Sequence, residues 1–251
     1  MNIRGIIFDV NGTLLDIYTN EWHDDVYRVL SNLLSYQGIA LAPNDIKYNY
    51  FEIMKEQRAA SGERHREFDV IGIFRKIIAE HATDFTRALP REKYEQLPIL
   101  LAEVHRAASR FRLQPYPGVE DTLRQLHSQY RLAVISDAQT PYALPELHAA
   151  GLSGYFDPII ISGDVGFRKP DLRLFSAALS AMKMDPSEVV HVGNDMYRDI
   201  YGAQGLKMKA VFFKSNQGVQ EKEGVKPDYI IYKFPELLDA IQFFKDSNQA
   251  R

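Results

Sequence analysis

The chain has 251 residues, of which 45% are hydrophobic and 25% charged, and its formal net charge is -3. This balance argues against a nucleic-acid partner, which normally requires a strongly basic face. No apolar run is long enough to span a bilayer, and no cysteine is present to form a disulfide, a thiolate metal site or a nucleophile. We therefore expect a cytoplasmic protein without membrane association.

A short apolar run opens the chain, GIIFDV at residues 5–10, and predicts a buried strand. Asp9 stands near its end, and Asn11, Gly12 and Thr13 follow. Asn-Gly between apolar runs is a common β-hairpin signal, so a hairpin is one interpretation of this turn. A functional loop is the other, and the two are compatible because a turn can also aim the Asp9 carboxylate.

Residues 18–111 show little strand signal and four amphipathic stretches with helical period. Pro117 and Gly118 then break the pattern before a new helix. The simplest interpretation is an all-helical domain at 18–111, inserted into a core domain made of residues 1–17 and 112–251. The four predicted helices lie at about 20–37, 44–60, 67–82 and 90–110.

Strand and helix patterns alternate from residue 112 onward. The apolar runs are continuous and rich in β-branched residues, as in parallel strands that are buried on both faces. This alternation predicts an α/β fold with a doubly wound parallel sheet. The predicted strands are 131–137, 158–162, 189–194, 209–213 and 228–232, and the predicted helices are 119–129, 172–182 and 196–204.

Polar side chains gather at the ends of these predicted strands. In an open parallel sheet, ligands bind outside the carboxyl ends of the strands. A set of acids with one lysine suits a divalent cation and an anionic substrate. Beyond the first strand, the residues at these ends are Ser136, Asp137, Arg168, Lys169, Asn194, Asp195 and Asp199.

Each of these residues also has a purely structural interpretation. Ser136 could cap its strand, and Lys169 could lie in a loop before a helix that has Pro170 in its first turn. Asp195 and Asp199 could be acids that favour a helix N-terminus. Four such sets, in this order at four strand ends, are difficult to explain by local structure alone.

The order of the motifs resembles that of the haloacid dehalogenase superfamily, whose members are mostly phosphatases. FDVNGTL at 8–14 looks like its first motif, VISDA at 134–138 its second, RKP at 168–170 its third and HVGNDMYRD at 191–199 its fourth. Residues 18–111 fall where many members insert a cap domain. The resemblance therefore implies a Rossmann-like core with a helical cap.

The resemblance also implies a Mg²⁺-dependent phosphatase that acts on a small phosphorylated substrate. Asp9 would be the nucleophile and form an aspartyl-phosphate intermediate. Lys169 would neutralise charge on this carboxylate and on the phosphoryl group. Asp199 would orient Lys169 or a metal-bound water. Such a site is plausible because phosphoryl transfer depends mainly on positioning and charge neutralisation.

The other motif residues would bind the metal ion and the substrate. Mg²⁺ would be held by Asp9, by the backbone carbonyl of Asn11 and by either Asn194 or Asp195. Ser136 and nearby backbone N–H groups would hold phosphate oxygens. The implied substrate-binding set is Thr13, Ser136, Asp137 and Lys169.

Three positions depart from the family pattern. Asn11 stands where the phosphatases usually carry an Asp that protonates the leaving oxygen, and an amide cannot do this. The loss corresponds to roughly 3–5 kcal/mol for poor leaving groups. In the second motif, Asp137 stands where the family usually has Asn. In the fourth motif, the family usually has Asp directly after Gly, whereas here Asn194 follows Gly193 and Asp195 comes next. We hypothesise that Asp137 or Asp195 partly replaces the missing acid; the alternative is that Asp137 hydrogen-bonds a neighbouring loop.

Two other functions stay open. A 2-haloacid dehalogenase would use Asp9 to attack carbon without a metal ion, but Asp195 and Asp199 argue against it. A regulatory member would bind Mg²⁺ and an anion and turn over poorly. Asn11 favours this interpretation, whereas retention of the rest of the catalytic set argues against it.

The predicted cap holds a cation-rich segment at residues 58–69. Arg58, Arg64 or Arg66 could contact a substrate from it, but we favour a solvated basic loop. The sequence leaves the identity of the substrate and the oligomeric state open.

Overall fold

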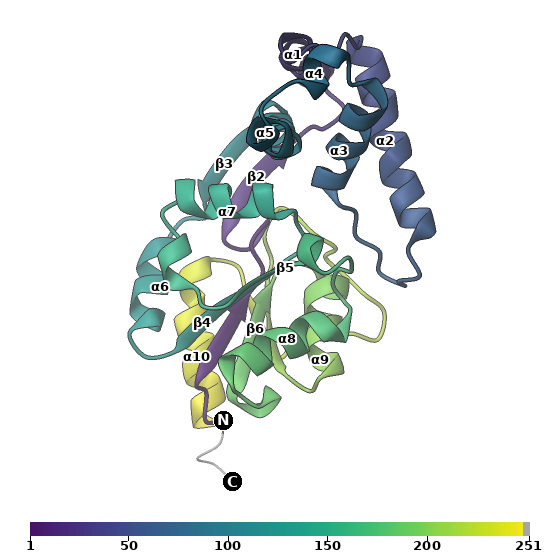
Figure 1. The fold of residues 1–251 in the computed structure, drawn as a ribbon. Coiled ribbons are helices and arrows are strands. Elements are labelled where there is room, and N and C mark those ends of the chain that lie inside the picture. The colour runs from purple at the N-terminus through teal and green to yellow at the C-terminus, as the bar shows by residue number, and fades with distance from the viewer. Residues whose placement is uncertain (248–251) are drawn as a thin grey trace.

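A six-stranded sheet forms the centre of the larger part of the molecule (Figure 1). The computed structural model describes residues 1–247. All neighbouring strands in the order β5-β4-β1-β6-β7-β8 are parallel, which confirms the predicted doubly wound α/β fold. The strands are β1 (Gly5–Phe8), β4 (Arg131–Ser136), β5 (Ile159–Ile161), β6 (Val189–Gly193), β7 (Lys209–Phe213) and β8 (Tyr229–Ile231).

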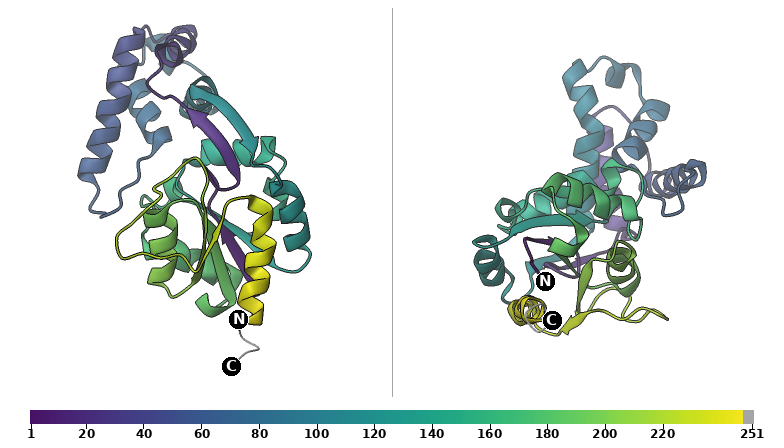
Figure 2. Two further views of the ribbon diagram at one scale, coloured as in Figure 1. Left: turned by 180° about the vertical axis from the view of Figure 1, so that it is seen from behind. Right: turned by 90° about the horizontal axis from the view of Figure 1, so that it is seen from below.

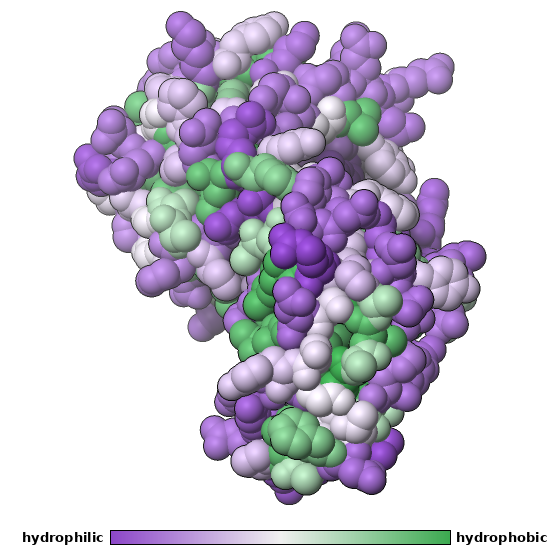
Figure 3. All heavy atoms as spheres, turned by 90° about the horizontal axis from the view of Figure 1, so that it is seen from above, coloured by the Kyte–Doolittle hydropathy of each residue, from purple (hydrophilic) through white to green (hydrophobic). Residues whose placement is uncertain are grey.

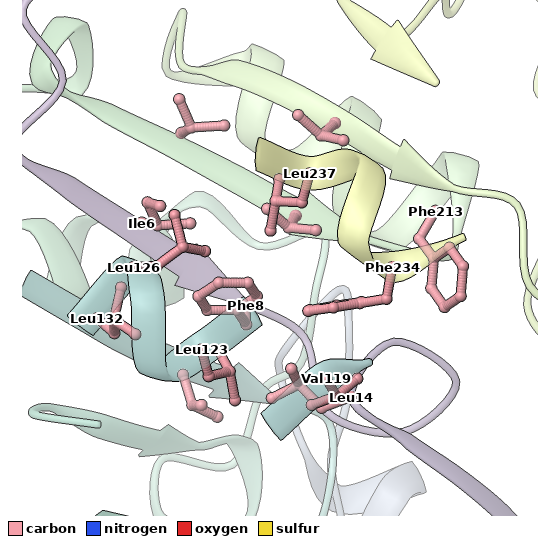
Figure 4. Close-up of a cluster of buried hydrophobic side chains, with 14 of the residues drawn as sticks. Ile6, Phe8, Leu14, Val119, Leu123, Leu126, Leu132, Phe213, Phe234 and Leu237 are labelled. Atoms are coloured by element: carbon pink, nitrogen blue, oxygen red, sulfur yellow. The ribbon is translucent and has the colours of Figure 1, made fainter. Parts of the chain in front are cut away.

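Helices cover both faces of this sheet, so the strands are apolar on both sides. Ile6 and Phe8 of β1 pack in one cluster with side chains of α6 and α10 (Figure 4). Ile7 points to the opposite face and packs with α8 and α9. The sheet helices are α6 (Val119–His127), α7 (Thr140–Ala149), α8 (Leu172–Met182), α9 (Gly202–Gly205) and α10 (Leu237–Asp246).

Helices of the first half of the chain form a block above the carboxyl ends of the strands (Figure 1). They share a hydrophobic cluster of their own, which Tyr142 of α7 joins from the sheet side. The four predicted helices are therefore present, and the division into two domains stays a prediction. The block contains α1 (Asp24–Tyr36), α2 (Pro43–Ala60), α3 (Val70–His81), α4 (Asp84–Arg87) and α5 (Arg91–Ser109).

The surface of the molecule agrees with this inward packing. Hydrophilic residues make up most of the face seen in Figure 3, although hydrophobic areas interrupt them. The N-terminus lies beside α10, at the end of the sheet away from the helical block (Figure 2). The amino group of Met1 donates a hydrogen bond to the Phe244 carbonyl there, at 2.7 Å. No helix within residues 1–247 is both long enough and apolar enough to cross a membrane.

Two unpredicted strands join the block to the sheet. β2 (Leu15–Thr19) and β3 (Arg110–Pro115) pair in antiparallel fashion, so both predicted domain boundaries fall inside one ribbon. The range 18–111 holds little strand structure, as expected, and its strand residues lie at its two ends. β3 lacks an apolar run, and none of its residues is fully buried. Its pairing partner is distant in sequence, which a local pattern cannot reveal.

The Asn-Gly turn after β1 is not a β-hairpin. β1 pairs only with parallel neighbours, while β2 pairs with β3. The turn closes around the Val10 carbonyl, which accepts the N–H groups of Leu14 and Leu15 at 2.8 and 2.9 Å. Gly12 has φ +89°, a value that favours glycine. This turn takes the chain out of the sheet and leaves Asp9 just beyond the end of β1.

The predicted helix at 196–204 has a different form. Residues Met196–Tyr201 form a π-helix, and only Gly202–Gly205 are α-helical. The Asp199 carboxylate accepts the N–H groups of Asn194 and Asp195 at 3.1 and 3.0 Å, which ties this wide turn back to the end of β6. π-Helical turns are rare and occur mainly at functional sites.

Other helix predictions need correction. α7 and α10 were not predicted, and α7 contains prolines at 141 and 145 that locally argue against a helix. Pro170 does not lie in the first turn of α8, because that helix begins at Leu172 with Asp171 as its N-cap.

The helical block should depend on Phe74, an α3 side chain that is 0% exposed. We expect Phe74→Ala to lower the free energy of unfolding by about 3–5 kcal/mol, because it leaves a cavity. Tyr48→Ala, at a ring that is 67% exposed, is the matched control and should change it by about 0.5 kcal/mol or less. Urea unfolding followed by circular dichroism measures both.

The same experiment tests the domain division. If the helical block is a domain, Phe74→Ala should shift one of two unfolding transitions and leave the other in place. A single transition that moves as a whole would contradict independent domains.

Candidate active site

Lys169 lies between two carboxylates at the carboxyl end of the sheet. Its Nζ is 2.6 Å from Asp9 Oδ1 and 2.6 Å from Asp199 Oδ1. The three side chains are no more than 8% exposed. Asp9 follows β1, Lys169 follows β5 and Asp199 follows β6, and β1 and β6 are neighbours in the sheet. The parallel topology therefore concentrates three charges from distant parts of the sequence in one buried site.

Burial and pairing give these groups different pKa values. Burial raises the pKa of Asp9 to about 6, although Lys169 opposes the shift. Burial would also raise the pKa of Asp199, but Lys169 and the nearby His191 outweigh it and hold that pKa below its usual value. Burial would lower the pKa of Lys169, but Asp199 and Asp9 outweigh it and raise that pKa. Lys169 and Asp199 thus stay charged as an ion pair, whereas the negative charge of Asp9 is only partly offset by Lys169.

Thr13 connects the first motif to the fourth. Its Oγ1 lies 3.1 Å from Asp9 Oδ2 and 3.2 Å from Asn194 Oδ1, so the hydroxyl can donate to either oxygen. Asp9 is therefore held at both oxygens, by Lys169 and by Thr13. The structure brings together five of the predicted site residues here, and one of them, Asp199, makes the Lys169 contact that the resemblance implies.

Several buried polar atoms at these strand ends lack a hydrogen-bond partner within the described part of the chain. They are Asn11 Oδ1, Ser136 Oγ and Asn194 Nδ2. Buried polar atoms are normally paired, so unpaired ones in a cluster need an explanation. Ser136 makes no capping bond, in contrast to its structural interpretation. These atoms are available to a ligand.

Asp137 and Asp195 are occupied by other contacts. Asp137 Oδ1 accepts the backbone N–H of Lys169 at 2.9 Å, and its Oδ2 lies 3.5 Å from Arg168 Nε. Asp195 accepts two backbone N–H groups at the start of the π-helix and pairs with Arg198 at 2.8 Å. These are the structural alternatives named for both residues. The hypothesis that either replaces the missing acid is therefore not supported by this geometry.

The oxygen atoms around Asp9 decide whether a metal ion fits. Among residues 1–247, no group of three or more His, Asp or Glu side chains is arranged to hold one. One carboxylate is present at Asp9, with amide oxygens at Asn11 and Asn194. Mg²⁺ is commonly bound by one or two carboxylates together with waters and substrate phosphate oxygens. The set thus fits a cation that is held jointly with a phosphate.

A cavity of about 650 Å³ opens between these strand ends and the helical block. This is a usual size for a small-molecule site. Asn11, Asp137 and Asn194 line it from the sheet side, and Arg58, Glu67 and Phe68 line it from the block. The cavity has space for a substrate much larger than a phosphate group.

A loop of the block docks on the loop that carries Lys169. The Glu67 N–H donates to the Gly166 carbonyl at 3.0 Å, and the Arg168 N–H donates to the His65 carbonyl at 2.9 Å. The buried Glu67 carboxylate accepts the Ser162 hydroxyl at 2.7 Å. Glu67 was not predicted as a site residue, because its partners lie far along the chain and it belongs to no motif.

Known proteins resemble this chain over most of its length. A family model for haloacid dehalogenase-like hydrolases matches residues 3–206. The glyceraldehyde 3-phosphate phosphatase of Methanothermobacter thermautotrophicus is 28% identical over 225 residues, which cover 89% of this chain and 91% of that protein. The phosphoglycolate phosphatase of Pectobacterium atrosepticum is 28% identical over 255 residues, which cover 98% and 96%.

Solved structures share the fold. A 2-haloacid dehalogenase from Pseudomonas syringae pv. Tomato DC3000 aligns with a TM-score of 0.70 at 23% identity, over 96% of this chain and 99% of that one. At this level of identity, the likeness shows the fold alone.

The raised pKa of Asp9 predicts a pH-dependent cost in stability. Between the usual value of 3.8 and about 6, the folded protein binds this proton more strongly than the unfolded chain. Protonated Asp9 therefore carries no cost at low pH. The favourable effect of this proton on folding is lost as the pH rises through about 6, where the buried carboxylate ionises. Asp9→Asn, an uncharged isostere, should be more stable than the wild type at pH 7 by up to about 3 kcal/mol. This difference should nearly vanish at pH 4.

Urea unfolding at pH 4, 5.5 and 7 without divalent cations measures the effect. Asp195→Asn is the control, and it should lower stability at pH 7 because its carboxylate caps a helix and pairs with Arg198. An Asp9→Asn protein that is less stable than the wild type at pH 7 would show that the ionised carboxylate is not a cost.

Proposed function

This chain belongs to the haloacid dehalogenase-like hydrolase family, and we propose that it is a Mg²⁺-dependent phosphatase for a small phosphorylated metabolite. The resemblance of its four motifs to this family is thereby confirmed. The observation that carries the proposal is the buried contact of Lys169 with both Asp9 and Asp199. The phosphatases among its relatives support the reaction class.

In the proposed reaction, a carboxylate oxygen of Asp9 attacks the phosphorus atom. The bond from phosphorus to the leaving oxygen breaks, the leaving group departs with the bonding electron pair, and an aspartyl-phosphate forms on Asp9. Lys169 keeps this carboxylate ionised near neutral pH and offsets charge on the phosphoryl group. Asp199 keeps Lys169 charged and in place. Water then attacks the phosphorus of the aspartyl-phosphate, which releases inorganic phosphate and restores the Asp9 carboxylate.

The substrate phosphate lies, in this proposal, among the unpaired polar atoms. Ser136 Oγ and backbone N–H groups donate to its oxygens, and Thr13 fixes the second oxygen of Asp9. Mg²⁺, when bound, neutralises negative charge on the phosphate. Asp9, the backbone carbonyl of Asn11 and the Asn194 amide oxygen would hold it. We favour Asn194 over Asp195, because the Asp195 carboxylate is occupied by Arg198 and backbone groups.

Asn11 favours a second candidate function. Its amide cannot donate a proton to a leaving alkoxide, and the nearby carboxylates of Asp137 and Asp195 are engaged elsewhere. This set of side chains suits a protein that binds Mg²⁺ and a phosphorylated ligand but turns over slowly. The two candidates differ in turnover and not in what they bind.

Phosphate release from aryl, acyl and sugar phosphates tests the phosphatase proposal. We expect metal-dependent release that chelator abolishes, and Asp9→Asn should reduce it by at least about 10³-fold because the nucleophile is lost. Arg64→Gln, at a residue outside the cavity, is the control. Release that persists in Asp9→Asn would refute the proposed nucleophile.

Asn11→Asp should restore acid catalysis. We expect turnover of sugar phosphates to rise by about 10²- to 10⁴-fold, because their alkoxide leaving groups need a proton. Acetyl phosphate and 4-nitrophenyl phosphate should respond far less, since their leaving groups depart without one. Steady-state rates for both classes provide the comparison. Equal gains for both classes would show that Asn11 limits the reaction in some other way, and no gain in either would favour the slow binding protein.

A further inference from the structure

The three arginines of the cation-rich segment have different surroundings. Arg58 lines the cavity above the strand ends. Arg64 lines a separate surface pocket beside Tyr197. The Arg66 side chain donates to the Glu63 carbonyl of its own loop at 3.0 Å. A contact to a ligand in the cavity is therefore open to Arg58 alone among the three.

Arg58 also differs from the other arginines of the cavity. Five arginines line it, and four of them have a carboxylate within 4 Å. Arg58 forms no ion pair with any residue from 1 to 247. The four pairs are Arg106 with Glu146, Arg112 with Asp16, Arg168 with Asp137 and Arg198 with Asp195.

Packing against Phe68 holds the Arg58 guanidinium in position. It lies 5.2 Å from the centroid of this ring, and Arg58 is partly buried. A stacked guanidinium keeps the N–H groups along its edge free to donate. Phe68 follows Glu67, which is fixed to Ser162 across the cavity wall. The cation is thus placed in advance, with no carboxylate of residues 1–247 within ion-pair distance. Glu21 is a charged neighbour of Arg58: burial raises the pKa of Glu21, and Arg106 and Arg58 oppose this shift.

The charge around Arg58 favours a monoanion. Glu21 and Glu67 line the same cavity from the helical block. A second phosphate, which carries close to two negative charges, would face more repulsion from these two carboxylates than a singly charged group would, and the nearest arginines, Arg106 and Arg168, lie 3.9 Å from Glu21 and Glu67 respectively. A carboxylate carries one charge, and its two oxygens match the fork of a guanidinium.

We propose that the substrate carries a carboxylate in addition to its phosphoryl group, and that Arg58 binds this carboxylate. The inference rests on the proposed function and adds the chemical class of substrate, a phosphorylated carboxylic acid. The phosphoryl group lies at Asp9, and the carboxylate extends toward the block. Arg58 is then a residue that determines specificity and takes no part in bond breaking.

Matched ligand pairs test this assignment. 2-Phosphoglycolate and ethyl phosphate differ in the carboxylate, as do 3-phosphoglycerate and glycerol 3-phosphate at greater length. Calorimetric binding to Asp9→Asn protein with Mg²⁺ present avoids turnover. We expect the carboxylated member of at least one pair to bind tenfold or more tightly. Adding Arg58→Gln should reduce this ratio of affinities within the pair to below threefold. Arg58→Lys should keep part of the ratio, and Arg64→Gln should leave it unchanged.

Three results would overturn the proposal. The first is equal affinity within both ligand pairs before Arg58 is changed. The second is an affinity ratio within a pair that survives Arg58→Gln. The third is tighter Arg58-dependent binding of propane-1,3-diyl bisphosphate than of either carboxylated ligand. Failure of the phosphatase proposal can be distinguished from failure of the carboxylate-binding proposal. Absence of phosphate release from wild type and Asn11→Asp, together with an Arg58-dependent ratio, would reject the reaction and keep the binding site.

Discussion

The ionic contact of Lys169 with Asp9 and Asp199 is the constraint on which the rest of the site depends. Three buried charges are costly unless they compensate one another at hydrogen-bond distance. Both Lys169 contacts are 2.6 Å long. This requires the ends of β1 and β6 and the loop after β5 to meet, which only the parallel sheet provides. The short turn at Gly12 and the π-helix serve the same purpose, since they aim Asp9 and Asp199 at the lysine.

The carboxylates of this edge fall into two classes. Asp137 and Asp195 stabilise loop and helix backbone and pair with arginines. Asp9 and Asp199 share the lysine, and the pKa of Asp9 is raised by burial. A simple count of acids therefore overstates the negative charge available to a cation. With amides at positions 11 and 194, a metal ion would depend strongly on the phosphate of the substrate, which couples metal binding to ligand binding.

The helical block contributes to the site as well as covering it. Its loop around Glu67 bonds to the loop that carries Lys169, through backbone groups and a buried carboxylate. The same loop supports Phe68 and, through it, Arg58. A displacement of the block would thus affect the placement of Lys169, the proposed catalytic lysine, and of Arg58 together. This links substrate size and charge to the geometry of the reacting centre.

The sequence by itself determined the parallel sheet, the long helices and the residues at the strand ends, because continuous apolar runs and helical periods are local patterns. It also identified Asp9, Lys169 and Asp199, since their order matches a known set of motifs. Only the tertiary structure decided which acids face the lysine, that Asp137 and Asp195 bond elsewhere, and that β2 pairs with β3. It alone set Glu67 and Arg58 apart from the other charged residues of the helical block. These outcomes depend on contacts between residues far apart in the chain, and such contacts leave no periodic signal in the sequence.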